Sequence, residues 1–304
     1  MALRRNETDP LCRLIRFDTT DDVSLAGVLF EPRRPSGSAA IFIHGTGGSS
    51  VFESKRTALL GEAFNRAGVA WFAFNNRGSQ IVRRAGATLG GFGYERIRDC
   101  VFDLDAAIRE LRRRGYRDLT LVGHSTGANK IAVYNHHQPR NGAKRFVLLG
   151  GGDDTGLLYK QLGSTRFRQS LLKARERIRA RRGEEIVPPN ISRLPMSWRS
   201  FYDMANPDGD YNVFPFLEVM NRVRLSRRPR FRFLRELRKP SLFLYGENDE
   251  YCFGDVPRCV AILDEALGPK PNVELAILAD ADHGFSGKES ELASVITNWM
   301  AVSS

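Results

Sequence analysis

The chain has 304 residues, of which 42% are hydrophobic and 10% aromatic, and its formal net charge is +11. This composition supports a sizeable hydrophobic core and excludes an intrinsically disordered protein. The positive charge is concentrated in residues 151–240, where 20 Lys and Arg accompany 10 Asp and Glu, so the rest of the chain is almost neutral. The distribution predicts a basic module added to an otherwise ordinary domain.

The sequence gives no sign of export, of a membrane span or of a metal site. The N-terminal residues MALRRNETDPLCRLIRFD lack the apolar run of a secretory signal, and no apolar stretch of about 18 residues occurs anywhere. We therefore expect a cytoplasmic protein. Cys252 and Cys259 could pair, but reduced thiols are expected in a chain without an export signal. The absence of CxxC and HExxH spacings predicts no metal, and we expect no cofactor.

Apolar strand-like runs alternate with helix-like runs along the first half of the chain. The predicted strands are residues 13–18 and 23–32, which resemble an opening hairpin, and then 39–45, 70–76, 119–125 and 145–151. The predicted helices between them are 55–68, 97–115 and 126–137. Strands that are apolar throughout and are followed by helices indicate a mainly parallel sheet covered on both faces, the α/β class.

The alternation stops at Gly151 and resumes after Pro240. The later elements are strands at 241–249 and 273–280 and helices at 256–267 and 288–301. Within the interruption, residues 165–182 predict a helix with Phe167, Leu171, Ala174 and Ile178 on one face. We interpret 151–240 as a mostly helical cap inserted into a core formed by 1–150 and 241–304.

The stretch LVGHSTGANK, residues 121–130, places one serine at a turn between a predicted strand and a predicted helix. Gly123 and Gly127 flank Ser125 at two residues on either side. A nucleophile at the apex of such a tight turn needs neighbours without Cβ atoms, because strand and helix approach closely there. The pattern G-x-S-x-G therefore predicts a nucleophile elbow with Ser125 exposed at the carboxyl edge of the sheet.

A serine hydroxyl is a weak nucleophile and needs a histidine base. Of the five histidines, we expect only His283 to approach Ser125 from another strand, because it follows the last predicted strand at the same edge of the sheet. The other histidines are His44, His124, His136 and His137. The first two are expected to form local hydrogen bonds within glycine turns, and the last two to end a helix at its C-terminal dipole. We predict His283 as the base.

The carboxylate that orients the histidine has more than one candidate. Asp249, in the turn G-E-N-D, follows a strand that ends on the catalytic edge. Asp153 and Asp154 follow the preceding strand and compete for the role, and Glu247 and Glu250 lie close to Asp249. We predict Asp249, and we expect Asp153 and Asp154 to serve as arginine partners in the basic segment.

Acyl transfer also needs donors for the developing oxyanion. The backbone N–H of Thr126, directly after the nucleophile, is one candidate. Thr46, in the turn HGTGGSS of residues 44–50, supplies the second. The glycines of this turn could suggest a phosphate cradle, but the Lys-Ser/Thr ending of a P-loop is absent.

The motifs HGTGG, GHSTG, GEND and DHGF, in this order, resemble those of the α/β-hydrolase superfamily. The resemblance covers residues 20–152 and 241–300, and its chain order of serine, acid and histidine falls on Ser125, Asp249 and His283. Residues 90–108 and the elbow sequence are similar to those of fungal siderophore (fusarinine) esterases, and the chain also resembles bacterial zearalenone lactonases. These resemblances imply a serine esterase or lactonase acting on a bulky, partly cyclic ester.

Other functions remain open from the residues alone. The same triad serves thioesterases, aminopeptidases and acyltransferases, and the fold also serves as a non-catalytic ligand receptor. We expect a small-molecule substrate, no specific nucleic acid and no membrane partner, while cap surfaces could form a homo-oligomer. Five cap aromatics are predicted to roof the substrate pocket, and these are Trp198, Phe201, Tyr202, Phe214 and Phe216.

Overall fold

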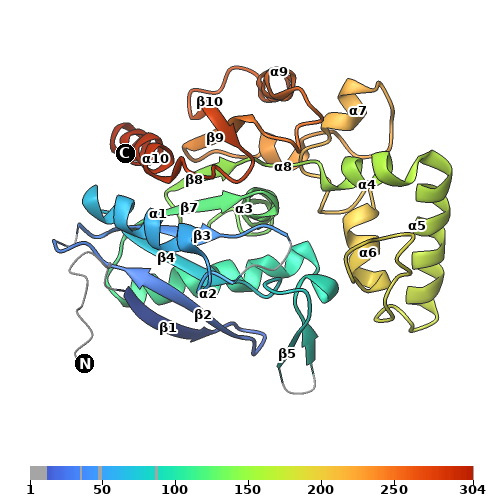
Figure 1. The fold of residues 1–304 in the computed structure, drawn as a ribbon, viewed down its shortest axis with the longest axis horizontal. Helices are drawn as coiled ribbons and strands as arrows, with labels where there is room; N and C mark the ends of the chain where they lie inside the picture. The colour runs from blue at the N-terminus through green and yellow to red at the C-terminus, as the bar shows by residue number, and fades with distance from the viewer. Residues whose placement is uncertain (1–11, 35, 47–49, 86–87, 304) are drawn as a thin grey trace, which may run out of the picture.

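The computed structural model describes residues 12–34, 36–46, 50–85 and 88–303. Its main feature is an eight-stranded sheet of order β1-β2-β4-β3-β7-β8-β9-β10 (Figure 1). The strands are β1 (Cys12–Asp18), β2 (Ser24–Phe30), β3 (Ser38–Ile43), β4 (Ala70–Asn75), β7 (Asp118–His124), β8 (Arg145–Leu149), β9 (Ser241–Asn248) and β10 (Val273–Asp282). β2 is antiparallel to both β1 and β4, and the pairs from β4 to β10 are parallel. The predicted hairpin and mainly parallel α/β sheet are confirmed.

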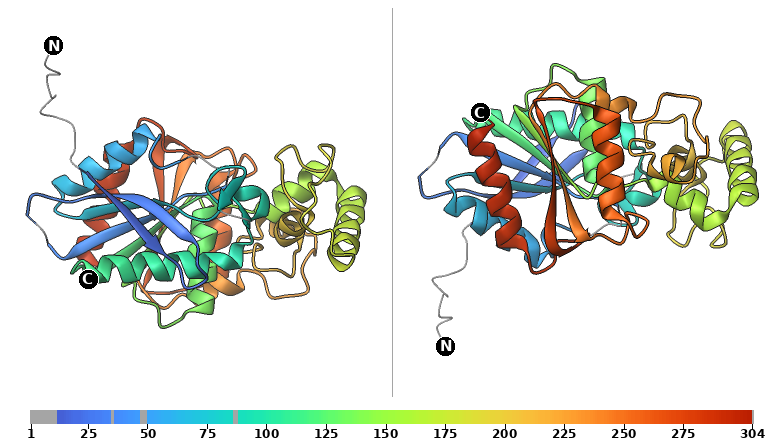
Figure 2. Two further views of the ribbon diagram at one scale, coloured as in Figure 1. Left: turned by 90° about the horizontal axis from the view of Figure 1, so that it is seen from below. Right: turned by 90° about the horizontal axis from the view of Figure 1, so that it is seen from above.

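Helices cover both faces of this sheet, as Figure 2 shows. They are α1 (Lys55–Arg66), α2 (Cys100–Arg113), α3 (Thr126–His137), α9 (Val256–Leu267) and α10 (Glu289–Val302). Alternate residues of one strand enter different cores: Ile41 belongs to the core under α2, α3 and α9, and Phe42 to the core under α1 and α10. This two-sided burial explains why the strands are apolar throughout.

Two local features differ from the sequence prediction. A short hairpin, β5 (Arg83–Ala85) and β6 (Thr88–Gly90), lies in a stretch where no strand was predicted. The strand predicted for 145–151 ends at Leu149, because Gly150 turns the chain with φ +53°. That turn matters for the site, since it brings Gly150 against the residues that follow β9 and β10.

The segment between β8 and β9 contains five helices. They are α4 (Asp154–Leu162), α5 (Ser164–Arg179), α6 (Trp198–Ala205), α7 (Phe216–Met220) and α8 (Arg232–Arg235). Only Gly163 separates α4 from α5, whereas long loops follow α5, α6 and α7. These loops contain the prolines Pro188, Pro189, Pro207 and Pro229, which are unfavourable inside a helix. On the helix predicted for 165–182, Phe167 and Ala174 are buried as expected.

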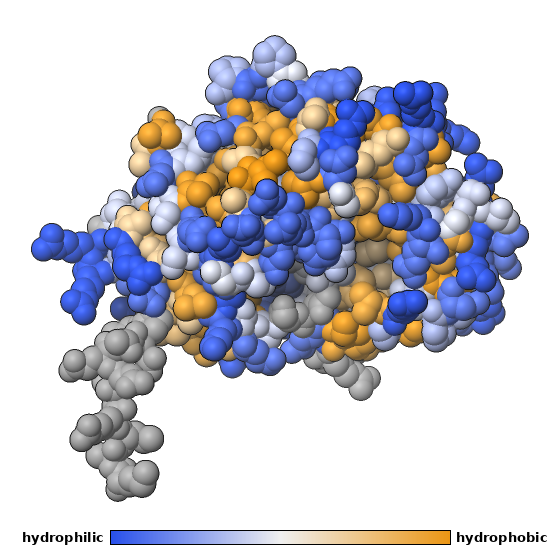
Figure 3. Space-filling view, turned by 45° about the horizontal axis from the view of Figure 1, so that its top comes forward, coloured by the Kyte–Doolittle hydropathy of each residue, from blue (hydrophilic) through white to orange (hydrophobic). Residues whose placement is uncertain are grey.

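Polar surface dominates the end of the molecule that carries α5, on the right of the space-filling view (Figure 3). The outer face of α5 is exposed and rich in arginine, while its inner face packs on α4 and α6. Within the part of the chain that the structure describes, no helix has the length and apolar character needed to cross a bilayer.

Candidate active site

Ser125 occupies the turn between β7 and α3 with a strained backbone, φ 57° and ψ −129°. The neighbouring glycines are required by close backbone approach. A Cβ on Gly123 would lie 2.3 Å from the Gly127 carbonyl oxygen, and one on Gly127 would lie 2.1 Å from the Ile43 oxygen. Gly45 is needed as well, since its Cβ would stand 2.7 Å from the Ser125 Cβ. At each of these three glycines a side chain would collide with neighbouring atoms, which explains the glycine pattern around the serine.

His283 and Asp249 form a buried pair at the ends of two adjacent strands. The Nδ1 atom of His283 lies 2.9 Å from each carboxylate oxygen of Asp249. Gly150 packs against both side chains, because a Cβ there would be 3.0 Å from Asp249 Oδ2 and 3.1 Å from His283 Nδ1. A carboxylate can only accept, so Nδ1 carries the proton and Nε2 keeps its lone pair.

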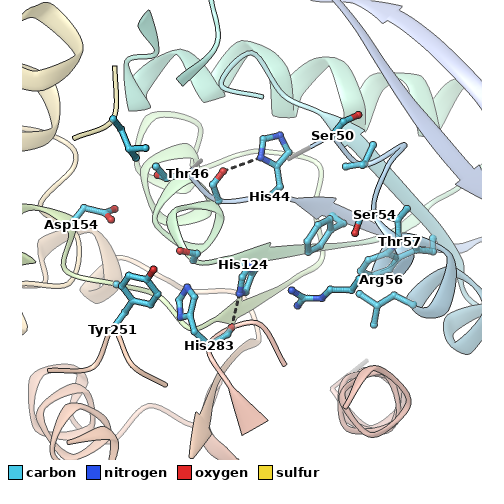
Figure 4. Close-up of a pocket in the computed structure, with 18 of the residues that line it drawn as sticks. His44, Thr46, Ser50, Ser54, Arg56, Thr57, His124, Asp154, Tyr251 and His283 are labelled. Carbon is cyan, nitrogen blue, oxygen red and sulfur yellow. Dashed lines mark hydrogen bonds between the residues drawn. The ribbon is translucent and has the colours of Figure 1, made fainter. Parts of the chain in front are cut away.

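Ser125 and His283 line a common cavity of about 440 Å³. Most of the labelled lining residues fall into two groups in Figure 4, with His44 and His124 between them. Thr46, Asp154, Tyr251 and His283 lie on one side, and Ser50, Ser54, Arg56 and Thr57 lie on the other. The ring of Tyr251 stands 4.5 Å from that of His283, centroid to centroid. The cavity has the volume of an ordinary small-molecule site.

The two residues predicted to supply the oxyanion donors are held together by their side chains. Thr46 Oγ1 and Thr126 Oγ1 are 2.6 Å apart, and the Thr126 hydroxyl donates to Asp154 Oδ2 at 3.1 Å. Thr126 is the first residue of α3, so its N–H has no intrahelical partner. Burial raises the pKa of Asp154 to about 6, against the opposing effects of the Thr126 hydroxyl and the charge of Lys130.

His124 and His44 support the site through neutral imidazoles. His124 Nε2 donates to the main-chain oxygen of His283 at 2.7 Å, and the two rings are 4.9 Å apart. Burial, reinforced by the charge of Arg56, holds the pKa of His124 well below its usual range. His44 donates through Nδ1 to the Gly45 oxygen at 2.9 Å, and burial lowers its pKa to about 4. The expected local bond of His44 is confirmed, whereas His124 bonds across to another strand.

The family model of the alpha/beta hydrolase family matches residues 40–294. The chain belongs to this family. Comparison with curated protein sequences gives no match.

Solved structures of similar fold share little sequence with this alpha/beta hydrolase. Est1E from Butyrivibrio proteoclasticus with ferulic acid bound is 16% identical, with a TM-score of 0.61 over 94% of this chain and 98% of that chain. A soluble variant of monoglyceride lipase from Saccharomyces cerevisiae, in complex with a substrate analogue, is 15% identical, with a TM-score of 0.63 over 99% and 98%. The Pyrococcus furiosus esterase Pf2001 is 15% identical, with a TM-score of 0.59 over 96% and 91%. At these identities the likeness concerns the fold.

The competing carboxylates of this alpha/beta hydrolase have other partners. Asp153 caps α4 by accepting from Gly156 N at 2.7 Å and also accepts from Leu217 N at 2.9 Å. Asp154 accepts from Thr126 and, at 3.4 Å, from Asn129 Nδ2. The expectation that both pair with arginines is wrong, because the chain turns into α4 directly after β8 and buries them beside backbone and hydroxyl donors.

The structure places the five cap aromatics away from the serine cavity. Trp198, Phe201, Phe214 and Phe216 are buried in the hydrophobic core, and Tyr202 packs against it. Helix α6 packs on α4 and α5 and on residues 92–94, so its rings fill the interior of segment 151–240 and its contact with the core. The segment reaches the serine cavity instead through Asp154, Leu157 and Leu194.

The sequence analysis did not identify Arg56 or Tyr251 as cavity residues, and it considered Asp154 only as a competing acid. Arg56 lies on a helix that looked like an ordinary amphipathic element, and Tyr251 was one of several residues after the predicted acid. His136 and His137 were expected to end α3 near its dipole. They also contact the inserted segment, where His136 Nδ1 lies 2.6 Å from Glu236 and His137 Nε2 lies 2.9 Å from Asp210.

Proposed function

We propose that the protein is a serine hydrolase that cleaves a carboxylic ester or lactone, with Ser125 as nucleophile, His283 as base and Asp249 as the orienting acid. The observation that carries this proposal is the buried Asp249–His283 hydrogen bond at the wall of the cavity that Ser125 also lines. Serine at the elbow is also consistent with an acyl-enzyme intermediate, because a hydroxyl forms an ester with the acyl group that water can later cleave.

The proposed reaction runs in two halves. His283 takes the Ser125 proton through Nε2 as the serine oxygen attacks the carbonyl, and Asp249 stabilises the resulting imidazolium. The Thr46 and Thr126 amides donate to the oxyanion, and His283 returns its proton to the leaving alcohol. Water, deprotonated by the same histidine, then attacks the acyl-enzyme and releases the acid.

We further propose that segment 151–240 acts as a cap and that the substrate is a bulky, partly cyclic ester. Leu157 and Leu194 of this segment give the cavity an apolar wall on the cap side. The resemblance to siderophore esterases and zearalenone lactonases supports a large substrate. Among the structures of similar fold, Est1E has ferulic acid bound, and the yeast monoglyceride lipase is in complex with a substrate analogue.

The experiment that tests the proposed reaction combines turnover with active-site labelling. Purified protein is assayed against 4-nitrophenyl esters of increasing chain length and against macrocyclic lactones, with products identified by mass. Ser125→Ala is expected to lower kcat by on the order of a million-fold and to abolish labelling by a fluorophosphonate. Ser290→Ala, an exposed serine of α10, is the matched control and should retain both.

Residual activity of Ser125→Ala within tenfold of the wild type would overturn the nucleophile assignment. Absence of both labelling and turnover in the wild-type protein would favour a non-catalytic receptor on the same fold.

A further inference from the structure

The serine cavity has a second polar wall, formed by the start of α1 and the loop before it. The side chains are those of Ser50, Ser54, Arg56 and Thr57 (Figure 4). Among the described lining residues the one carboxylate is Asp154, which lies on the opposite side in that view. The second wall therefore presents a cation and hydroxyl groups without a neutralising acid.

Arg56 is the central feature of this wall, because its guanidinium has no partner among the described residues. Its Nε and Nη2 atoms are both buried and make no hydrogen bond. In Figure 4 the guanidinium extends from α1 toward His124. The charges of Glu289 and Asp282 act on Arg56, but neither residue forms an ion pair with it within 4.0 Å. Burial lowers the pKa of Arg56 to about 10, so the group stays charged at neutral pH.

A buried charged donor without a partner destabilises the fold by more than a neutral one does, because removing a charge from water costs more. Such a group is expected to gain a partner when a ligand binds. The other arginines near the core illustrate the contrast: Arg77 pairs with Asp21 and Asp103, each at 2.9 Å. Among the described residues, Arg56 thus stands out as a buried cation whose guanidinium is left without a partner.

Trp71 and Ser50 also line this cavity, and each has a hydrogen-bond donor that a ligand can use. The Nε1 atom of Trp71, a residue only 1% exposed, is also buried and has no partner among the residues that the structure describes. Ser50 Oγ accepts from Asn75 Nδ2 at 3.0 Å and from Phe52 N at 3.3 Å, so its own proton is available to a ligand. Helix α1 has no acidic residue in its first turn, and its N-cap Ser54 makes no capping bond.

We propose that this wall is a carboxylate-binding subsite centred on Arg56, so that the substrate carries a carboxylate in addition to the ester cleaved at Ser125. The proposal rests on the proposed hydrolase function. Nε and Nη2 lie on one edge of the guanidinium, with the spacing of the two oxygens of a carboxylate, and this bidentate match favours a carboxylate over a neutral acceptor. Binding supplies partners for donors that the described part of the chain leaves unpaired, and it selects acidic esters over neutral ones of equal length.

The test compares esters that differ only in charge. In the acyl series, mono-4-nitrophenyl adipate is measured against 4-nitrophenyl hexanoate. In the alcohol series, 4-carboxyphenyl hexanoate is measured against 4-tolyl hexanoate. The wild-type enzyme should prefer the acidic ester in at least one series. Arg56→Met should lower that preference, the ratio of the two kcat/KM values, by roughly ten- to hundred-fold, as expected for a bond to a charged group.

Arg56→Lys should restore part of the preference, because it keeps the charge without the planar edge. Arg66→Met, at the exposed far end of the same helix, is the matched control and should leave the ratio unchanged. The subsite proposal is overturned if Arg56→Met leaves both ratios unchanged, including the case in which it slows both esters equally through structural damage.

A binding measurement separates failure of the subsite from failure of the hydrolase proposal. Monomethyl adipate and methyl hexanoate are titrated calorimetrically into Ser125→Ala protein, which needs no turnover. Monomethyl adipate should bind more tightly than methyl hexanoate, and the double variant with Arg56→Met should lose the difference. Equal binding of the two esters would contradict the subsite even if the enzyme hydrolyses esters, whereas selective binding without any turnover would contradict only the hydrolase proposal.

Discussion

Asp249 is the proposed acid of the triad. Its carboxylate contacts His283 Nδ1 through both oxygens, while one of them also accepts from Tyr251 N at 2.9 Å. We predict that Asp249→Asn keeps the fold and lowers kcat by on the order of ten-thousand-fold, because an amide can hold the imidazole in the wrong tautomer. Steady-state kinetics with a 4-nitrophenyl ester checks this, with circular dichroism as the test of folding.

The neighbouring carboxylate Asp154 offers the matched control. In Asp154→Asn the amide oxygen can still accept from the Thr126 hydroxyl, so kcat should stay within about tenfold of wild type. If Asp249→Asn is nearly as active as wild type while Asp154→Asn is inactive, the acid must be reassigned to the residues that follow β8.

At the scale of elements, Asp203 links α6 of the inserted segment to the core by accepting from Ile97 N at 2.8 Å. Burial raises the pKa of this carboxyl from 3.8 to about 7, against the opposing effect of the Ile97 N–H. The native state therefore holds this proton more tightly than the unfolded state does. The stability that the proton contributes is fully present below about pH 4 and is lost as the pH rises through 7.

We predict that Asp203→Asn becomes more stable relative to wild type as the pH rises from 4 to 8. The amide keeps an acceptor for Ile97 and never ionises, so the gain approaches a few kcal/mol, at about 1.4 kcal/mol for each pKa unit. Urea unfolding at several pH values measures it. Asp264→Asn, on the exposed side of α9, controls for simple loss of a charge. A stability difference that does not change with pH would rule out a buried, titrating Asp203.

At the scale of the whole molecule, the charge of segment 151–240 raises the question of nucleic-acid binding. Part of that charge is paired on the surface, since Arg177 and Arg182 both contact Glu185, and Arg199 contacts Glu184. Binding of single strands also needs exposed aromatic rings for base stacking. Four of the five cap aromatics, Trp198, Phe201, Phe214 and Phe216, are instead buried.

We predict only weak association with DNA or RNA, with a dissociation constant of about 10⁻⁴ to 10⁻⁶ M near physiological salt and no sequence preference. Fluorescence anisotropy over a salt series measures it, and the affinity should fall steeply as salt increases, because the attraction comes from charge alone. Submicromolar, sequence-selective binding at physiological salt would revive nucleic acid as a partner.

The sequence by itself determined the features that depend on local periodicity and on backbone sterics. Buried parallel strands must be apolar on both faces, so the order of strands and helices could be read directly from the hydrophobic runs. The elbow could be read because Gly123 and Gly127 stand where any Cβ would collide with backbone atoms. His283 could be selected because it follows the last strand, and parallel strands end on one edge of the sheet.

Only the tertiary structure decided which side chains have partners, because partners come from distant parts of the chain. In the sequence, Asp153 and Asp154 competed with Asp249, the predicted acid. In the structure, Asp153 caps a helix and Asp154 meets a threonine hydroxyl, while Asp249 meets His283. The cap aromatics could equally have roofed a pocket or filled a core, and long-range packing buried four of them. Arg56 is unremarkable within its helix, and its significance arises because no described residue from another element comes close enough to pair with it.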